Sequence, residues 1–422
     1  MPDRRNAPLI NQIEQIDLPS PNKYFLDNGI PVYEINKGTQ EIIKIEVVFH
    51  AGRPYEQKKL AARATASLIK EGSVHRSSAE ISETIDFYGG TLGTPYNLDT
   101  SNIVLYSLNR HFEQLLPLAA EAIKTPVFPQ DELEAYIKKS KQSLQVDLQK
   151  NDVVAYRKIT EFIFGADHPY GYNSFPETYD FLSRKDLLDH HQKNYTKDNC
   201  SIFISGKSSP EIIGLLNQYL GKEMPQGKSM LNFFPKEIPT AAKVKIPHAD
   251  NVQTAIRIGR KLFNRKHEDY NGMYLVNTIL GGYFGSRLMN NIREDKGYTY
   301  NIYSAIDTMH EDGCFYIGTE VGNEFAEATK EEIYKEIYLL QNEYVEEQEL
   351  QMVRNYLLGN LLTMLDGPFN IGEVIKTMVI EDLSTEAFDS LVQTIKTISP
   401  EEIQSLAKKY FKPEDLWEVI VG

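Results

Sequence analysis

Two stretches of the chain repeat one plan: residues 182–206, LSRKDLLDHHQKNYTKDNCSIFISG, and residues 398–422, ISPEEIQSLAKKYFKPEDLWEVIVG. They align without a gap, 216 residues apart. Ser183 aligns with Ser399, and residue types agree in order along both stretches although identities are few. Agreement over a whole segment favours internal duplication over chance.

The elements predicted before each closing stretch follow the same order. In the first half, an Asn28-Gly29 turn joins two strands, a small-residue helix ends at Gly72, and Ser77 and Glu80 have the spacing of a capping box. In the second half we expect a strand at 255–259, a helix at 273–280, a glycine turn at 281–282, a helix at 286–295 and a strand at 298–306.

This pattern predicts an α+β fold of two structurally similar α/β-sandwich domains, each a mostly antiparallel sheet with helices packed on it. We place an N-terminal domain at residues 1–220 and a C-terminal domain at 241–422. The segment 221–240 between them is rich in proline and glycine and is predicted to be a linker.

Composition narrows the classes of protein to consider. The 422 residues are 41% hydrophobic and carry a net charge of −14, which argues against a nucleic-acid or anionic-membrane partner. No apolar run approaches the roughly 20 residues of a membrane span, and the start does not have the pattern of a signal peptide. Cys200 and Cys314 lie in apolar runs and are predicted to be buried free thiols. We therefore expect a cytoplasmic protein.

Four further stretches, in order along the chain, carry a family resemblance. They are EGSVHRSSAEISETIDFYGGTL at 71–92, FGADHPYG at 164–171, GGYFGSRLMNNIREDKGYTY at 281–300 and ISPEEIQSLAKKYF at 398–411. With them the chain resembles the pitrilysin/insulinase family of zinc peptidases, and particularly its bacterial heterodimeric members and the mitochondrial processing peptidases. The resemblance implies a metallohydrolase fold of the processing-peptidase type.

In that family, a helix of the first domain carries His-x-x-Glu-His, which supplies two zinc ligands and the general base. Counting back from Gly72, the resemblance places Arg63 and Ser67 at the histidine positions and Ala66 at the glutamate position. The distal ligand position falls near Lys141 or Gln142. This degenerate motif implies that the chain has no catalytic residue and no metal of its own.

No other metal or nucleotide site is indicated by the sequence. No two of the nine histidines flank a glutamate at helical i, i+4 spacing, and the adjacent His190 and His191 point about 100° apart on a helix. The glycine cluster at 281–285 lacks the Gly-Lys-Ser/Thr of a phosphate loop. We expect no cofactor on this chain.

Arg293 and Tyr300 are the candidate substrate-binding residues, together with Gly281 and Gly282. Arg293 is predicted near the end of a helix and Tyr300 on the strand that follows a turn at Gly297. They resemble the family's Arg/Tyr pair, in which the guanidinium would grip the substrate and the phenol would donate to the oxyanion. The alternative is structural: Arg293 complements the helix dipole and pairs with a neighbour, while Tyr300 packs in the core.

The predicted function follows from two features: the zinc motif is degenerate, but the Arg/Tyr pair, Arg293 and Tyr300, is present. We expect a non-catalytic subunit that binds and positions unfolded peptides for a partner of the same family carrying His-x-x-Glu-His and zinc. The partner would form a heterodimer, and a homodimer in isolation is left open. The chain alone is expected to be inactive. The alternatives are a scaffold subunit with no role in proteolysis and a peptidase with an unrecognised site.

Overall fold

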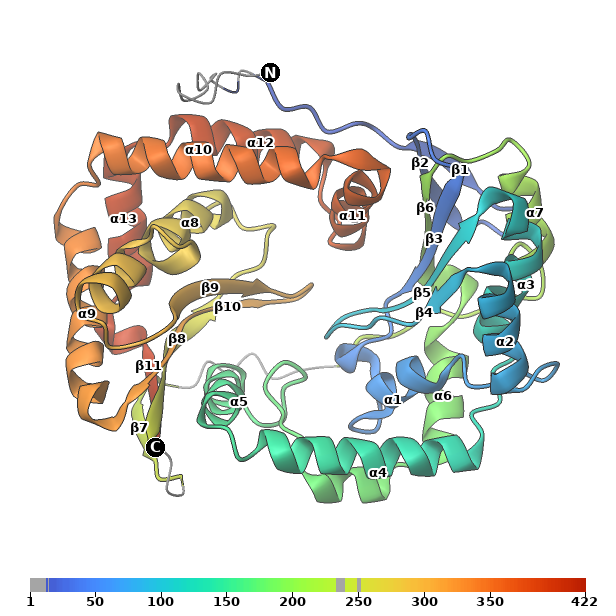
Figure 1. The fold of residues 1–422 in the computed structure, drawn as a ribbon, viewed down its shortest axis with the longest axis horizontal. Helices are drawn as coiled ribbons and strands as arrows, with labels where there is room; N and C mark the ends of the chain where they lie inside the picture. Colours follow the sequence, from blue (N-terminus) through green and yellow to red (C-terminus); the bar gives the residue numbers. More distant parts are fainter. Residues whose placement is uncertain (1–12, 14, 233–239, 249–251) are drawn as a thin grey trace, which may run out of the picture.

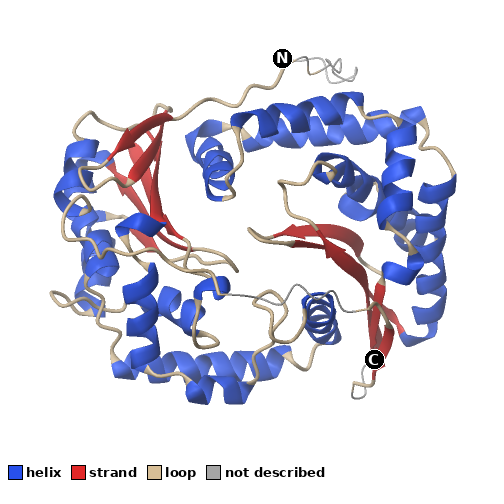
Figure 2. Cartoon of the chain, turned by 180° about the vertical axis from the view of Figure 1, so that it is seen from behind, coloured by secondary structure: helices blue, strands red, loops and turns tan. Residues whose placement is uncertain are grey.

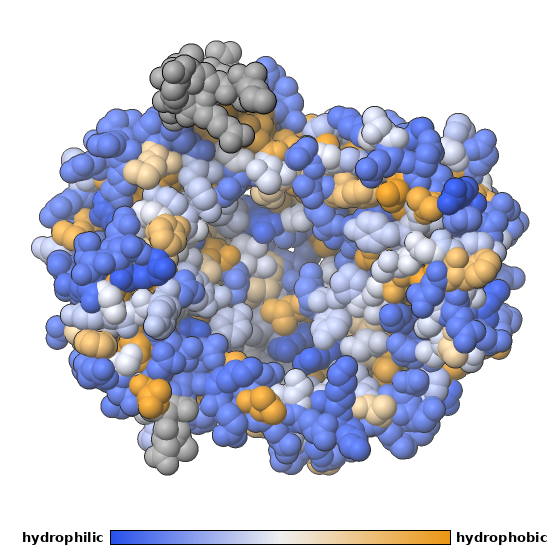
Figure 3. Space-filling model, viewed as in Figure 1, coloured by the Kyte–Doolittle hydropathy of each residue, from blue (hydrophilic) through white to orange (hydrophobic). Residues whose placement is uncertain are grey.

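The computed structural model describes residues 13, 15–232, 240–248 and 252–422. Two sheets face a central hollow, and most of the helices form an outer layer around them (Figures 1 and 2). The space-filling view shows the same hollow as an opening between the two halves (Figure 3). No helix within the described residues is both long and apolar enough to cross a bilayer.

The first sheet is built from the first half of the chain in the order β1-β2-β6-β3-β5-β4. Only β2 and β6 are parallel neighbours. Gly29 takes a φ of +91° in the predicted turn between β1 and β2, which glycine adopts without strain. The strands are β1 (Asn22–Phe25), β2 (Pro31–Asn36), β3 (Ile42–Phe49), β4 (Thr91–Gly93), β5 (Ser101–Leu108) and β6 (Cys200–Gly206).

The second sheet repeats this topology in the order β7-β11-β8-β10-β9. Its single parallel pair, β7 and β11, corresponds to β2 and β6, and the other pairs are antiparallel. The predicted fold class of two similar mixed α/β units is confirmed. The strands are β7 (Lys243–Ile246), β8 (Gln253–Leu262), β9 (Ile302–Thr308), β10 (Gly313–Gly322) and β11 (Trp417–Val421).

Thirteen α-helices lie in the described residues. Those of the first half are α1 (Ala61–Leu68), α2 (Ser78–Tyr88), α3 (Phe112–Lys124), α4 (Gln130–Asp147), α5 (Asn151–Phe164), α6 (Arg184–Asn194) and α7 (Ile212–Tyr219). Those of the second half are α8 (Tyr270–Asn277), α9 (Ala326–Asn342), α10 (Glu347–Met364), α11 (Gly367–Ile380), α12 (Thr385–Thr397) and α13 (Pro400–Tyr410). Two π-helical segments, η5 (Thr278–Gly282) and η6 (Met289–Asp295), follow α8.

The aligned closing stretches fold alike. Ser183 and Ser399 are the N-caps of α6 and α13, and each forms a capping box with the acidic residue three positions on. The aligned Tyr195 and Phe411 are both fully buried. The predicted capping box of Ser77 and Glu80 at the start of α2 is also present.

Two equivalent helices are exchanged between the halves. Helix α5 extends from α4 and packs on β8 and β11 of the second sheet, whereas α11 extends from α10 and packs on β2 and β6 of the first (Figure 1). Their bounds lie 216 residues apart, like the closing stretches. The exchange ties the halves together, because each sheet buries one face against a helix of the other half.

Charged side chains reinforce the contact of α11 with the first sheet. Lys44 and Glu46 on β3 are almost fully buried, and their side chains pair at 2.7 Å. On α11, Lys376 pairs with Glu46 at 2.8 Å and Glu373 pairs with Lys44. A buried charge without its partner is costly, so this four-residue network specifies where α11 docks.

Three sequence predictions about the second half are wrong in detail. The expected strand at 298–306 begins only at Ile302, and residues 298–301 form a loop, because their backbone does not pair with β10. The helix expected at 273–280 ends at Asn277 as an α-helix and continues as π-helix η5, which also includes the residues of the expected glycine turn at 281–282. The domain limits stay a prediction. Of the linker, residues 233–239 lie outside the described residues, as do residues 1–12 of the N-terminal domain.

Candidate functional site

Helix α1 carries the degenerate motif, and its packing explains its small side chains. The carboxylate of Glu56 accepts a hydrogen bond of 3.1 Å from the backbone N–H of Ala62 and so satisfies one donor at the start of the helix. Ala66 is fully buried where α1 packs against its neighbours, chiefly α6. Arg63 is exposed, and Ser67 is half-buried one turn later. Of the three motif positions, packing therefore accounts for Ala66 alone, and the arginine, alanine and serine at these positions do not fit a zinc ion.

The position of the distal ligand is equally unsuited to a metal. Lys141 on α4 forms an ion pair of 2.6 Å with Asp180, and Gln142 is its neighbour on the same helix. Within residues 13, 15–232, 240–248 and 252–422, no group of three His, Cys, Asp or Glu side chains could hold a metal ion.

His190 and His191 on α6 act as structural histidines. The His190 ring bonds to the carbonyl of Ala51 at 3.0 Å, and the His191 ring bonds to the carbonyl of Ile123 at 2.7 Å. Burial lowers the pKa of each to about 4, so both rings are neutral at pH 7. They point to different partners, as their adjacency in the helix predicts.

In the second half, the structure brings Arg293 and Tyr300 into contact through the tyrosine backbone. The Nε of Arg293 donates to the carbonyl oxygen of Tyr300 at 2.9 Å. The guanidinium lies 4.9 Å from the ring centre of Phe284 and also pairs with Glu294. The pairing foreseen by the structural alternative for Arg293 is thus present, but Tyr300 is not a core residue, because its side chain is 91% exposed.

The glycines near this loop have distinct environments. Gly281 is buried in η5 against β9, where a Cβ would lie 2.5 Å from the backbone nitrogen of Ser304. Gly282 is exposed, and Gly297 takes a φ of +67° as its N–H bonds to the Arg293 carbonyl. Close backbone approach explains Gly281, and the turn after η6 explains Gly297.

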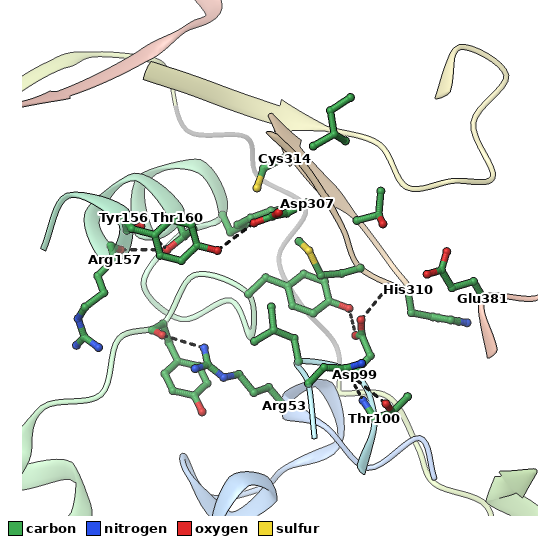
Figure 4. A pocket seen from close by; sticks show the side chains of 18 of the residues that line it. Arg53, Asp99, Thr100, Tyr156, Arg157, Thr160, Asp307, His310, Cys314 and Glu381 are labelled. Atoms are coloured by element: carbon green, nitrogen blue, oxygen red, sulfur yellow. Dashed lines mark hydrogen bonds between the residues drawn. The ribbon is translucent and has the colours of Figure 1, made fainter. Parts of the chain in front are cut away.

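A polar cavity of about 490 Å³ lies between the two halves (Figure 4). Asp99 of the first half accepts hydrogen bonds from the Tyr170 hydroxyl and, at 2.9 Å, from the backbone N–H of His310 in the second half. Tyr156 on α5 donates to Asp307 on β9 at 3.0 Å. Burial raises the pKa of both carboxyls. The contacts of Asp99 and Asp307 therefore connect elements on either side of the cavity, and both carboxyl groups already have hydrogen-bond partners.

The sequence did not indicate several of the residues gathered here. Glu56 is almost fully buried, and burial raises its pKa to about 7 despite hydrogen bonds from Tyr172 and Ala62. Arg53 and Arg157 line the polar cavity between the halves. Tyr170, which also lines the cavity, lies in the stretch FGADHPYG that carried the family resemblance. Glu56, Arg53 and Arg157 lie in no motif, and only the fold brings them together.

Comparisons with known proteins agree with this architecture. Residues 182–357 match the family model described as peptidase M16 inactive domain, a segment that contains Arg293 and Tyr300. A Bacillus subtilis protein named uncharacterized zinc protease YmxG is 21% identical over 92% of this chain and 95% of its own length. Another B. subtilis protein, the probable inactive metalloprotease YmfF, is 22% identical over 70% of this chain and 71% of its own.

A solved structure supports the fold. The crystal structure of a peptidase M16 inactive domain from Pseudomonas fluorescens superposes with a TM-score of 0.88 at 22% identity, covering 95% of this chain and 98% of that one. Together with the sequence matches, it confirms the resemblance predicted from the four stretches.

Proposed function

We propose that this chain is a non-catalytic subunit of the pitrilysin/insulinase type that binds unfolded peptides and positions them for a zinc-bearing partner. The observation that carries the proposal is the environment of two side chains in residues 293–300. This segment runs from the end of η6 into the loop before β9 and is called the Arg293–Tyr300 loop below. Arg293 is held by the Tyr300 carbonyl, the Phe284 ring and its ion pair with Glu294, while the Tyr300 side chain is 91% exposed. A held cation beside an exposed phenol suits contact with another molecule better than packing within this chain.

The chemistry of the two groups fits a peptide. A guanidinium can grip a carbonyl or carboxylate oxygen with parallel N–H donors, and a phenol can donate to an oxyanion that develops at a scissile carbonyl. Each sheet ends in an edge strand, β4 in the first and β9 in the second, beside which an extended peptide can add as a further strand. Zinc and the general base would come from the partner, because the motif positions here are arginine, alanine and serine.

Reconstituted cleavage tests the role of the pair. The partner bearing His-x-x-Glu-His would be captured from the source cells with the tagged chain, and cleavage of an unfolded peptide would be measured with the pure components. We expect Tyr300→Phe and Arg293→Ala each to lower kcat/KM by about 100-fold or more, the usual loss for one oxyanion or gripping donor.

An exposed tyrosine and an exposed arginine elsewhere on the chain serve as matched controls. Tyr338→Phe removes a hydroxyl from a tyrosine that is 61% exposed on α9, and Arg110→Ala removes an exposed arginine of the first half. Both should leave cleavage unchanged. Equal rates for the Arg293 and Tyr300 variants and the unsubstituted chain would contradict the gripping role.

Metal analysis tests the division of labour. The purified chain should hold far less than one zinc per molecule and cleave nothing without its partner. One zinc per chain would sink the proposal. A scaffold role predicts instead that the complex forms and that the pair is dispensable, an outcome that the kinetics of the Arg293 and Tyr300 variants would reveal directly.

A further inference from the structure

A recess remains beside the degenerate motif, although the residues that would hold zinc are gone. It has a volume of about 280 Å³ and lies between the start of α1, the end of β3 and the loop before β5. Arg53 and Arg63 line it together with Tyr96, Asn97 and residues 51–52 and 100–101. A guanidinium, that of Arg63, therefore stands where the resemblance places a zinc ligand, and Arg53 lines the same recess.

Neither arginine is neutralised. In the part of the chain that the structure describes, Arg53 and Arg63 form no ion pair with a carboxylate. This is unusual in a protein with a net charge of −14, in which most arginines of the second half have an acidic partner. Glu56 lies near Arg53, but its carboxyl is occupied by Tyr172 and Ala62.

Aromatic rings and carbonyls hold the two side chains in place. The Arg53 guanidinium stacks 4.4 Å from the Tyr172 ring centre and donates to the carbonyls of Pro169 and Tyr172 at 3.3 Å. The Arg63 guanidinium lies 6.0 Å from the Tyr96 ring centre. Stacking of this kind orients a guanidinium without cancelling its charge, which leaves it available to an anion.

The recess adjoins the larger cavity between the halves. Both are lined by Arg53, Asn97, Leu98 and Thr100. A third guanidinium, that of Arg157, lines the larger cavity, and its pKa is lowered by burial and by the charge of Arg53 (Figure 4). An anion bound at Arg53 and Arg63 would relieve this repulsion between like charges.

We propose that this arginine recess binds a carboxylate group of the peptide. The inference rests on the proposed peptide-binding role and names a chemical feature of the ligand. A carboxylate accepts parallel hydrogen bonds from a guanidinium fork, and partial exclusion of water strengthens the contact. The carboxylate can come from the C-terminus of the peptide or from an acidic side chain, and the experiment separates the two.

Binding of labelled peptides to the isolated chain tests the proposal. Three unstructured peptides of one neutral sequence would be titrated by fluorescence anisotropy: a free acid, its C-terminal amide, and an amide with one internal glutamate. We expect at least one acidic peptide to bind about 10-fold or more tightly than the plain amide, and Arg63→Ala to remove that preference. Tighter binding of the free acid identifies the C-terminus as the source of the carboxylate, and tighter binding of the glutamate-containing amide identifies an acidic side chain.

Two further variants separate binding from general charge and from folding. Arg63→Lys keeps the charge but loses the fork, so the preference should fall only in part. Arg110→Ala removes an equal charge beyond the far end of β5 and should leave the preference intact. Far-UV circular dichroism and the thermal midpoint would show that each variant is folded.

The outcomes distinguish the two proposals. Peptide binding with no preference for an acid, or an Arg63→Ala variant that weakens acid and amide equally, overturns the carboxylate site and leaves the proposed function standing. No binding of any peptide to the chain, with or without its partner, overturns the peptide-binding function and the recess with it.

Discussion

The degenerate motif helix α1 and the Arg293–Tyr300 loop differ in what constrains their residues. Ala66 is fully buried, and packing alone accounts for its small side chain. Tyr300 is 91% exposed, and no packing within the chain accounts for its aromatic ring. Core packing explains a small apolar residue at a buried position even where no catalytic group remains. An exposed aromatic residue has no such packing, and contact with another molecule explains it better.

The strongest challenge to this comparison is to put the missing base back. Ala66→Glu would force a longer, charged side chain into a fully buried position of α1, and we expect a loss of more than about 3 kcal/mol in the free energy of unfolding. Urea unfolding followed by circular dichroism measures it. The control Arg63→Gln changes an exposed residue of the same helix and should cost less than about 0.5 kcal/mol. Similar losses for both variants would mean that α1 is not held by its buried face.

The pH dependence of stability tests the buried face of α6. Burial lowers the pKa of His190 and His191 to about 4, below the ordinary value of 6.5 that applies to the unfolded chain. The unfolded state therefore binds protons first, and stability present above pH 6.5 is lost as the pH falls from 6.5 towards 4. Each histidine contributes up to about 3 kcal/mol to this loss.

A histidine variant isolates that effect. His191→Gln should reduce the fall in unfolding free energy by about 1.4 kcal/mol per pH unit between pH 6 and 5. Glu56 acts in the opposite direction, because its raised pKa makes stability fall as the pH rises from 4.5 through about 7, but it is present in both proteins and cancels. Tyr300→Phe should keep the slope of the unsubstituted chain. An unchanged slope for His191→Gln would show that the ring takes up its proton at the same pH in the folded and unfolded states.

Gly281 separates packing from binding within the second half. A Cβ there would lie 2.5 Å from the Ser304 backbone nitrogen, so Gly281→Ala should destabilise the protein by about 1 to 3 kcal/mol. Gly359→Ala is the matched control, since nothing lies within 4 Å of its added Cβ on α10. That change should be neutral or stabilising by up to about 1 kcal/mol. Equal thermal midpoints for the two variants would leave substrate contact as the better explanation of Gly281.

The smallest expected effect concerns Tyr300 itself. Tyr300→Ala should change the free energy of unfolding by less than about 0.5 kcal/mol, because the side chain is exposed. A large loss in thermal denaturation would make the loop a structural element and would remove the contrast with α1.

The sequence predicted much of the framework. Hairpin and capping signals at Asn28-Gly29, Ser77, Ser183 and Ser399 are local, and each is found where it was expected. The Tyr298–Asn301 segment was predicted wrongly as strand. Alternating aromatic residues favour a strand, but only a neighbouring backbone can complete one, and β10 pairs with β9 from Ile302 onward.

By itself the sequence determined the duplication, the order of most elements and the residue types at the motif positions Arg63, Ala66 and Ser67, because these depend on residue identity and local hydrogen bonding. Only the tertiary structure decided that α5 and α11 exchange sheets, that Arg53 and Arg63 share a recess and that Tyr300 is exposed. An amphipathic helix has an apolar face to bury, but nothing in its own sequence names the sheet that covers it. Contacts of that kind join residues hundreds of positions apart, and they exist only once the chain has folded.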